Sequence, residues 1–157
     1  MADEAYTLDD KGQKVVWSGA ITEVHSTQKE TVGAVRYHGT KVYKYVHFTQ
    51  GATAVASGDF AGYLKERRDS VTADFSTTDI VPAGMFVSTP ADGNFCWIQV
   101  RGPATCTVAN LSGVADGVVV KLDASNDKKA VAQTAGTKGV AQSIDTTAGL
   151  IYIDAHI

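Results

Sequence analysis

The chain has 157 residues, 44% of them hydrophobic, and a formal net charge of −3. A chain of this length is most simply one domain that buries roughly two-thirds of its unfolded surface, so its core needs no metal or disulfide. The 14 basic residues are scattered among 17 acidic ones, which argues against a nucleic-acid partner. No apolar run reaches about 18 residues, so we expect no membrane partner either.

The N-terminus predicts a cytoplasmic origin. Its first four residues, MADE, are acidic where a signal peptide would be basic, and no apolar segment follows them. We therefore expect the protein to be made in the cytoplasm and to stay there, or to leave it by a route that needs no leader.

Residues 1–13 predict an extended N-terminal arm ahead of a single β domain at residues 14–157. The arm is polar apart from Tyr6 and Leu8, so it cannot repay an ordering entropy of roughly 1–2 kcal/mol per residue by itself. Tyr6 and Leu8 are two positions apart, so an extended strand would place them on one face. This spacing suits addition to a neighbouring sheet and makes both residues candidates for partner contact.

The first strands of the domain are predicted at residues 15–24, 32–37 and 42–48, with a hairpin at residues 38–41. Within 42–48, Tyr43 and Tyr45 share one face of the strand, and the other face is also apolar. One face is therefore available for another subunit, and both tyrosines are candidates for partner contact. Two alternatives stay open for them: a stacking platform with Trp97 for bases or sugars, and cross-strand packing inside the fold.

Residues 60–68 fit either a short helix or a strand that ends in a charged loop, and we favour the strand. Further short strands are predicted at residues 53–56 and 70–75. Arg67 and Arg68 are candidates for contact with a partner. Because acidic residues flank them, a solvated loop of balanced charge is the stronger interpretation.

Residues 81–108 carry the strongest fold signal. The strand predicted at residues 95–101 alternates, so Cys96, Ile98 and Val100 point into the main core. Trp97 is also predicted to be buried, on the opposite side of the strand, together with Phe95 and against a loop or a neighbouring subunit.

Gly102-Pro103 predicts a turn that ends this strand, so that residues 85–88 and 105–108 pair on either side of it in a three-stranded meander. In such a hairpin Cys96 and Cys106 are out of register for a disulfide. We therefore expect two buried free thiols.

The C-terminal third predicts strands at residues 118–122, 130–133, 139–144 and 150–157. Across the chain, turn signals recur every 8–12 residues, the spacing typical of sandwiches and barrels. The sequence thus predicts an all-β fold, a β-sandwich or β-barrel of antiparallel hairpins, jelly-roll-like or similar.

We expect no enzymatic activity, cofactor or metal. The phosphate-binding loop G-x-x-x-x-G-K-[ST] and the nucleophile elbow G-x-S-x-G are both missing from the sequence. The four histidines, at positions 25, 38, 47 and 156, are never two or four residues apart, so a metal site would depend wholly on the fold.

Two segments resemble the decoration, or cement, proteins of tailed bacteriophage heads. The first is Phe95-Cys96-Trp97-Ile98-Gln99-Val100-Arg101-Gly102, an aromatic and hydrophobic run ending in Arg-Gly. The second is the C-terminal pattern of Asp116-Gly117-Val118-Val119-Val120 followed by Gly139-Val140-Ala141-Gln142. Residues 51–60 are similar to the Ala/Gly-rich entry strand of these proteins, and the resemblance spans residues 45–157.

The resemblance implies a structural virion protein that binds the outer surface of a phage capsid and reinforces it. Its partners would be the major capsid protein and its own copies, as a trimer or dimer, on the capsid exterior. Two other classes stay open. One is a tail or head-fibre β-module or carbohydrate-binding β-sandwich that uses Tyr43, Tyr45 or Trp97, and the other is a small β-barrel enzyme.

Overall fold

The all-β prediction is confirmed. The computed structural model describes residues 4–8, 14–65, 67–76, 80–135 and 139–155, with side chains from Gly19 onward except that of Arg68. The strands are β1 (Glu4–Leu8), β2 (Lys14–Ser18), β3 (Val24–His25), β4 (Val35–His38), β5 (Lys41–Phe48), β6 (Phe60–Leu64), β7 (Arg67–Thr72), β8 (Ile80–Phe86), β9 (Phe95–Thr105), β10 (Val119–Leu122), β11 (Ala130–Ala132), β12 (Ala141–Asp145) and β13 (Leu150–Asp154). One 3-10 helix, η1 (Val108–Leu111), interrupts them.

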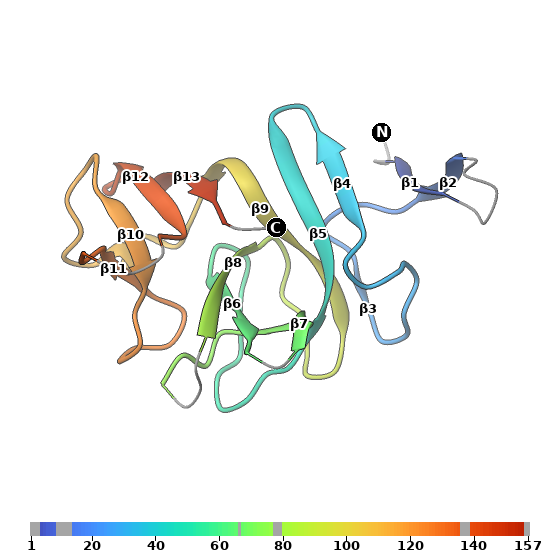
Figure 1. Cartoon of the computed structure of the whole chain (residues 1–157), viewed down its shortest axis with the longest axis horizontal. Coiled ribbons are helices and arrows are strands. Elements are labelled where there is room, and N and C mark those ends of the chain that lie inside the picture. Colours follow the sequence, from blue (N-terminus) through green and yellow to red (C-terminus); the bar gives the residue numbers. More distant parts are fainter. Residues whose placement is uncertain (1–3, 9–13, 66, 77–79, 136–138, 156–157) are drawn as a thin grey trace.

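Five strands close into a small barrel. They follow the order β9-β8-β6-β7-β5, and β5 pairs again with β9 to complete the ring (Figure 1). Closure pairs strands that would otherwise be exposed edges. One contact departs from the predicted antiparallel hairpins, because β5 and β7 run parallel, with His47 opposite Ser70.

Side chains from alternate positions of the strands fill the interior of this barrel. Cys96, Ile98 and Val100 of β9 are fully buried in one cluster with Val46 and Phe48 of β5. This is the inward row that the sequence pattern predicts for β9. The β-branched side chains of Ile98 and Val100 suit a pleated, enclosed surface.

The strand β9 does not end at Gly102-Pro103, and the predicted turn there is wrong. β9 continues to Thr105 and changes partners on the way, pairing with β5 up to Arg101 and with β13 from Arg101 onward. Gly102 has a φ of +99°, and a Cβ on it would lie 2.6 Å from the backbone oxygen of Thr40. The glycine therefore serves a bend and a close backbone approach within one strand rather than a chain reversal.

Beyond that bend, β9 joins β13, β12, β10 and β11 to form the C-terminal sheet. The inward row of β9 continues here as Ala104 and, just past the strand, Cys106, which pack in a second cluster with Ile151 and Ile153 of β13. Residues 105–108 form no strand beside residues 95–101, because the chain after Thr105 enters η1. The predicted three-stranded meander is therefore half correct, since only β8 pairs with β9 as expected.

The N-terminal residues form a hairpin of their own. Residues of β1 pair with β2, from Glu4 opposite Ser18 to Leu8 opposite Lys14, in a two-stranded sheet separate from the large one. The predicted arm therefore pairs with residues assigned to the domain, and the boundary at residue 13 falls inside the hairpin. Residues 9–13, which complete the predicted arm, lie outside the described residues.

Three further local predictions are corrected. The strand predicted at residues 15–24 is two strands, β2 and β3, and residues 53–56 form no strand. For residues 60–68 the favoured strand is confirmed as β6, whereas the charged loop predicted after it is wrong at Arg67 and Arg68, which begin β7. The tertiary pairing of these strands overrides a short helical spacing.

The two cysteines lie in different clusters, Cys96 in the barrel and Cys106 under the C-terminal sheet. Both are free and buried. Burial raises the pKa of Cys96 to about 12 and that of Cys106 to about 11. The expectation of buried thiols agrees with the structure, although the hairpin register on which it was based does not exist.

We expect both thiols to be unreactive toward a thiol-specific reagent at pH 8 in the native protein and both to react in denaturant. Because their folded pKa values are raised, the stability that the neutral thiols contribute is complete below pH 9 and is lost as the pH rises toward 11–12. Each thiol then lowers the free energy of unfolding by up to about 1.4 kcal/mol per pH unit. Urea unfolding of the wild type and of Cys106→Ala at pH 8 and pH 10.5 measures this, and an equal alkaline loss in both contradicts it.

Candidate interaction surface

The outer face of β9 is covered in its first half. Tyr43, Tyr45 and Trp97 lie there in a third cluster, all at most 3% exposed. Ile21, Val32 and Ala34 pack onto them from the covering loop, which we define as residues 19–34. Burial of Trp97 against a loop agrees with the prediction.

This burial contradicts the role predicted for Tyr43 and Tyr45. Because the covering loop of the same chain already occupies that face, neither tyrosine is available as a contact for a partner or as a stacking platform with Trp97. The aromatic side chains that are exposed among the described residues are Tyr37 and Tyr152, on β4 and β13. The strand pattern showed that two faces were apolar and could not show what covers the second.

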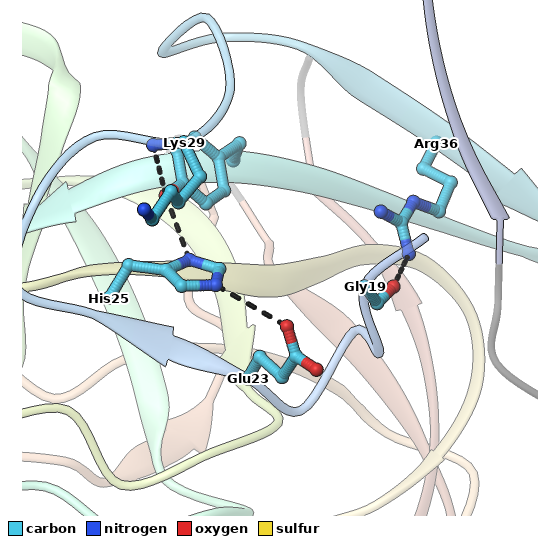
Figure 2. Close-up of polar contacts among 6 residues, drawn as sticks. Gly19, Glu23, His25, Lys29 and Arg36 are labelled. Carbon is cyan, nitrogen blue, oxygen red and sulfur yellow. Dashed lines mark hydrogen bonds and ion pairs between the residues drawn. The ribbon is translucent and has the colours of Figure 1, made fainter. Parts of the chain in front are cut away.

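Polar contacts fasten the covering loop to the barrel. The hydroxyl of Tyr45 accepts a hydrogen bond from the backbone N–H of Lys29 (3.3 Å) and lies 3.0 Å from Nδ1 of His25. Nε2 of His25 is 3.4 Å from a carboxylate oxygen of Glu23 (Figure 2). A neutral imidazole that accepts at Nδ1 and donates at Nε2 satisfies all three contacts.

The order hydroxyl, imidazole, carboxylate is also that of a catalytic triad. Here, however, Tyr45 is fully buried, and this burial raises the pKa of its hydroxyl. A buried neutral phenol cannot reach a substrate as a nucleophile. We therefore interpret the chain Tyr45–His25–Glu23 as a fastening for the covering loop.

Replacing Tyr45 with Phe tests this interpretation. The ring and its packing remain, while the hydroxyl that joins His25 and Lys29 is lost. We expect the free energy of unfolding to fall by about 1 kcal/mol, the usual net value of such hydrogen bonds. Amide exchange should accelerate in residues 19–34 and stay unchanged in β6. Uniform acceleration across both segments would contradict the assignment.

A buried cation holds the start of the same loop. Nη1 of Arg36 donates to the backbone oxygen of Gly19 at 2.8 Å, as Figure 2 shows. The guanidinium also lies 4.4 Å from the ring centroid of Trp97, a cation–π distance. Arg36 therefore joins the first residue of the covering loop to the aromatic cluster beneath it.

Over the second half of β9, the outer face of the sheet is exposed to solvent. On β13 the buried Ile151 and Ile153 alternate with Leu150 and Tyr152, which are 41% and 40% exposed. Tyr152 pairs with Pro103 of β9 on one side and with Gln142 of β12 on the other. Exposed apolar side chains thus recur on neighbouring strands on the side away from the core, with Gln142 between Tyr152 and Val119.

This surface extends over four strands and is here called the C-terminal face. Its outward residues are Arg101, Pro103 and Thr105 of β9, Val119 and Lys121 of β10, Gln142 and Ile144 of β12, and Leu150, Tyr152 and Asp154 of β13. Ile144 is 53% exposed, the most of its apolar members. A hollow of about 250 Å³ at its margin is lined by residues of β9, β12, β13 and Lys41.

Hydrogen bonds hold one end of the face, and its margin is charged. Asp116 accepts from the backbone N–H and the hydroxyl of Thr146 at 2.8 and 2.7 Å, which holds the β12–β13 turn and lowers the pKa of that carboxyl. Arg101 lies 4.0 Å from Asp154, and Lys41 and Lys121 add two positive charges. Asp145, opposite the outward Leu150, and Asp116 add two negative charges, so the margin carries both signs.

A second, open groove of about 800 Å³ lies over the paired strands β5 and β7, beside the covering loop. Its lining is Gln28, Val32, Gly33, Lys44, His47, Arg67, Asp69, Ser70 and Phe95. Arg67, a predicted contact residue, is exposed here next to Asp69. The strands of Tyr6, Leu8 and Arg68 are described, whereas their side chains lie outside the description, so the contacts predicted for these three remain predictions.

Acidic residues elsewhere have structural partners. Asp59 accepts from the side-chain amide of Asn110 at 2.8 Å and lies 3.9 Å from Nζ of Lys128. Asp127 accepts from the hydroxyl of Thr53 and from the backbone N–H of Phe75. These contacts connect loops of the barrel to η1 and to the loop between β10 and β11. Within the described residues, no three His, Cys, Asp or Glu side chains converge as a metal site.

No family model, curated protein or solved structure matches the chain. In the part of the chain that the structure describes, no helix is long and apolar enough to cross a membrane. Among the described residues, the C-terminal face is the strongest candidate for a functional surface.

Proposed function

We propose that the chain is a structural virion protein that binds the outer surface of a phage capsid shell and reinforces it. The observation that carries the proposal is the bare C-terminal face, where Val119, Ile144, Leu150 and Tyr152 stay 40–53% exposed on one side of a sheet. Contiguous exposed apolar surface on a soluble protein marks a binding site for another macromolecule.

The type of surface suits attachment to a repeating lattice. A sheet face presents fixed side chains on a rigid backbone, so binding costs little ordering entropy. On a shell the same contact is repeated many times, and linked copies gain avidity even where one contact is modest. The proposed partners are the major capsid protein and further copies of this chain, on the capsid exterior after synthesis in the host cytoplasm.

Binding is a better basis for the proposal than catalysis. The arrangement closest to a catalytic one among the described side chains is Tyr45–His25–Glu23, and its hydroxyl is inside the fold. The three aromatics that the sequence suggested for a sugar-binding module, Tyr43, Tyr45 and Trp97, are equally buried. The resemblance of residues 95–102 to decoration proteins supports the capsid shell as the partner.

Gradient-purified particles from the source culture test the proposal. We expect quantitative mass spectrometry to find the chain in a constant ratio to the major capsid protein across preparations. Because apolar contacts resist screening, the ratio should survive a wash in about 1 M NaCl. A chain that stays at the top of the gradient, or a ratio that varies between preparations, contradicts it.

A further inference from the structure

The strand β4 has one side without a neighbouring strand. The large sheet ends at β4, which pairs with β5 alone (Figure 1). The backbone N–H of Tyr45 donates to the oxygen of Ala34, and hydrogen-bonded pairs alternate along two antiparallel strands. The N–H and C=O groups of Val35 and Tyr37 therefore point away from β5. Within the described ranges, no strand pairs with these groups and no backbone hydrogen bond reaches them.

This edge also carries an exposed aromatic side chain. Tyr37 is 74% exposed, the most of any large apolar side chain among the described residues. Soluble proteins usually protect a sheet edge with outward charges, prolines or bulges. β4 contains no proline, and its register with β5 has no bulge. Its arginine, Arg36, is buried and directed toward Gly19 and Trp97. The edge of β4 is therefore suited to the addition of another strand.

A second copy of the chain is complementary to this edge. If two β4 strands run antiparallel about a two-fold axis at Tyr37, each Tyr37 exchanges two backbone hydrogen bonds with its mate. The two rings become cross-strand neighbours, and such aromatic pairs contribute up to about 1 kcal/mol. Val35 of one copy then lies opposite Gly39 of the other, beside which a Cβ would meet nothing within 4 Å. A register centred on Arg36 would instead place two cations opposite each other, which is destabilising.

The charges near the edge permit this pairing. Lys41 and Lys44 are on β5, so three strand spacings, about 14 Å, separate β5 of one copy from β5 of the other. This distance exceeds the screening length of about 8 Å at physiological salt. His38 lies opposite Arg36 of the second copy, whose guanidinium is 4.4 Å from the ring centroid of its own Trp97. The attraction comes from the backbone groups and from Tyr37.

We propose that β4 of one copy pairs antiparallel with β4 of a second copy, which joins the two large sheets about a two-fold axis at Tyr37. This inference rests on the proposed function for the further copies of the chain and deepens it, because it gives their contact a place and a symmetry. One pair of short strands buries little area, so we expect a weak dimer with a Kd on the order of 100 μM. Copies held side by side on a shell gain from the same contact through avidity.

Amide exchange in the wild-type protein tests the pairing without any substitution. In the dimer the N–H of Tyr37 is bonded to the second copy, whereas the N–H of His38 faces Lys41 of its own chain in both states. Between about 20 μM and about 1 mM protein, exchange of the Tyr37 N–H should slow by about fourfold, as the monomer fraction falls. The His38 N–H should not respond. A Tyr37 rate that is independent of concentration overturns the pairing.

Cross-linking tests the register. Tyr37→Cys should form a disulfide-linked dimer under mild oxidation, because facing Cα atoms of a bonded pair are about 5.5 Å apart. Thr40→Cys is the matched control, since Thr40 is also exposed but the two copies of it are about 20 Å apart in this register. The native thiols of Cys96 and Cys106 are buried and do not compete. Equal cross-linking at both positions overturns the register.

Tyr37→Pro tests the backbone bonds. Proline removes the outward N–H and leaves the β4–β5 bonds in place, and edge strands tolerate it where that N–H faces solvent. With folding checked by circular dichroism, sedimentation equilibrium should show Kd raised by at least about tenfold. A folded proline variant that dimerises like the wild type overturns the proposal.

The outcomes also separate this inference from the proposed function. A chain that stays monomeric at about 1 mM and still saturates capsid shells overturns the β4 pairing and keeps the capsid partner. A chain that dimerises through Tyr37 and does not bind shells keeps the pairing and overturns the capsid partner.

Discussion

Ile98→Asp is expected to unfold the protein. Ile98 is fully buried inside the barrel, in the inward row of β9 between Cys96 and Val100. Lys44 lies opposite Ile98 on β5, but its Nζ is 4.7 Å from the ring centroid of Tyr63. A carboxylate inside the apolar cluster still loses its hydration, and burial of a charged group costs several kcal/mol. That cost is comparable to the whole stability of a domain of this size. Circular dichroism and urea unfolding measure the loss.

Thr105→Asp is the matched control, because Thr105 lies on the same strand with its side chain exposed. It should change the free energy of unfolding by no more than about 0.5 kcal/mol, as surface substitutions usually do. If Ile98→Asp folds like the wild type, the inward row of β9 is assigned to the wrong face.

Gly84→Ala is expected to have the second largest effect on stability. Gly84 has a φ of +142°, and a Cβ on it would lie 2.1 Å from the backbone oxygen of Gln99 on the adjacent strand. A backbone atom cannot move aside without separating β8 from β9, so strain and overpacking combine to about 3 kcal/mol or more. Urea unfolding at neutral pH gives the difference.

Gly93→Ala separates the two causes. Gly93 also has a positive φ, +76°, but a Cβ there meets nothing within 4 Å. It should cost only the strain of a left-handed alanine, about 1 kcal/mol. Equal losses in the two variants would show that steric contact with Gln99 plays no part.

The sequence predicted those parts of the fold that depend on local alternation. Cys96, Ile98 and Val100 could be assigned to a core because successive residues of a strand point to opposite sides. The hairpin between β4 and β5 followed from Gly39 in a short polar segment, and the structure pairs His38 with Lys41 there. Both inferences need only a few neighbouring residues.

The features that the sequence did not predict depend on contacts between residues far apart in the chain. Gly102-Pro103 has the composition of a turn, and only the approach of Thr40 shows why a glycine stands inside a strand. Tyr43 and Tyr45 face the covering loop, whose few apolar residues gave no sign that it would fold over them.

The C-terminal face was hidden in the sequence for a related reason. Residues 150–153 are all apolar, so Leu150 and Tyr152 could not be told from Ile151 and Ile153 as the exposed pair. Only the second cluster of buried residues fixes which side is inward. The hairpin was missed because residues 1–13 were considered without Lys14–Ser18, with which they pair.

Titration of capsid shells with the purified chain tests the central claim most directly. Phage capsid shells that lack the chain are mixed with increasing amounts of it and sedimented, and the bound protein is quantified. We predict saturation at a fixed ratio of chains to capsid subunits, since equivalent sites on a lattice are filled once each. A chain that stays in the supernatant, or that binds in linear proportion without a plateau, would contradict the claim.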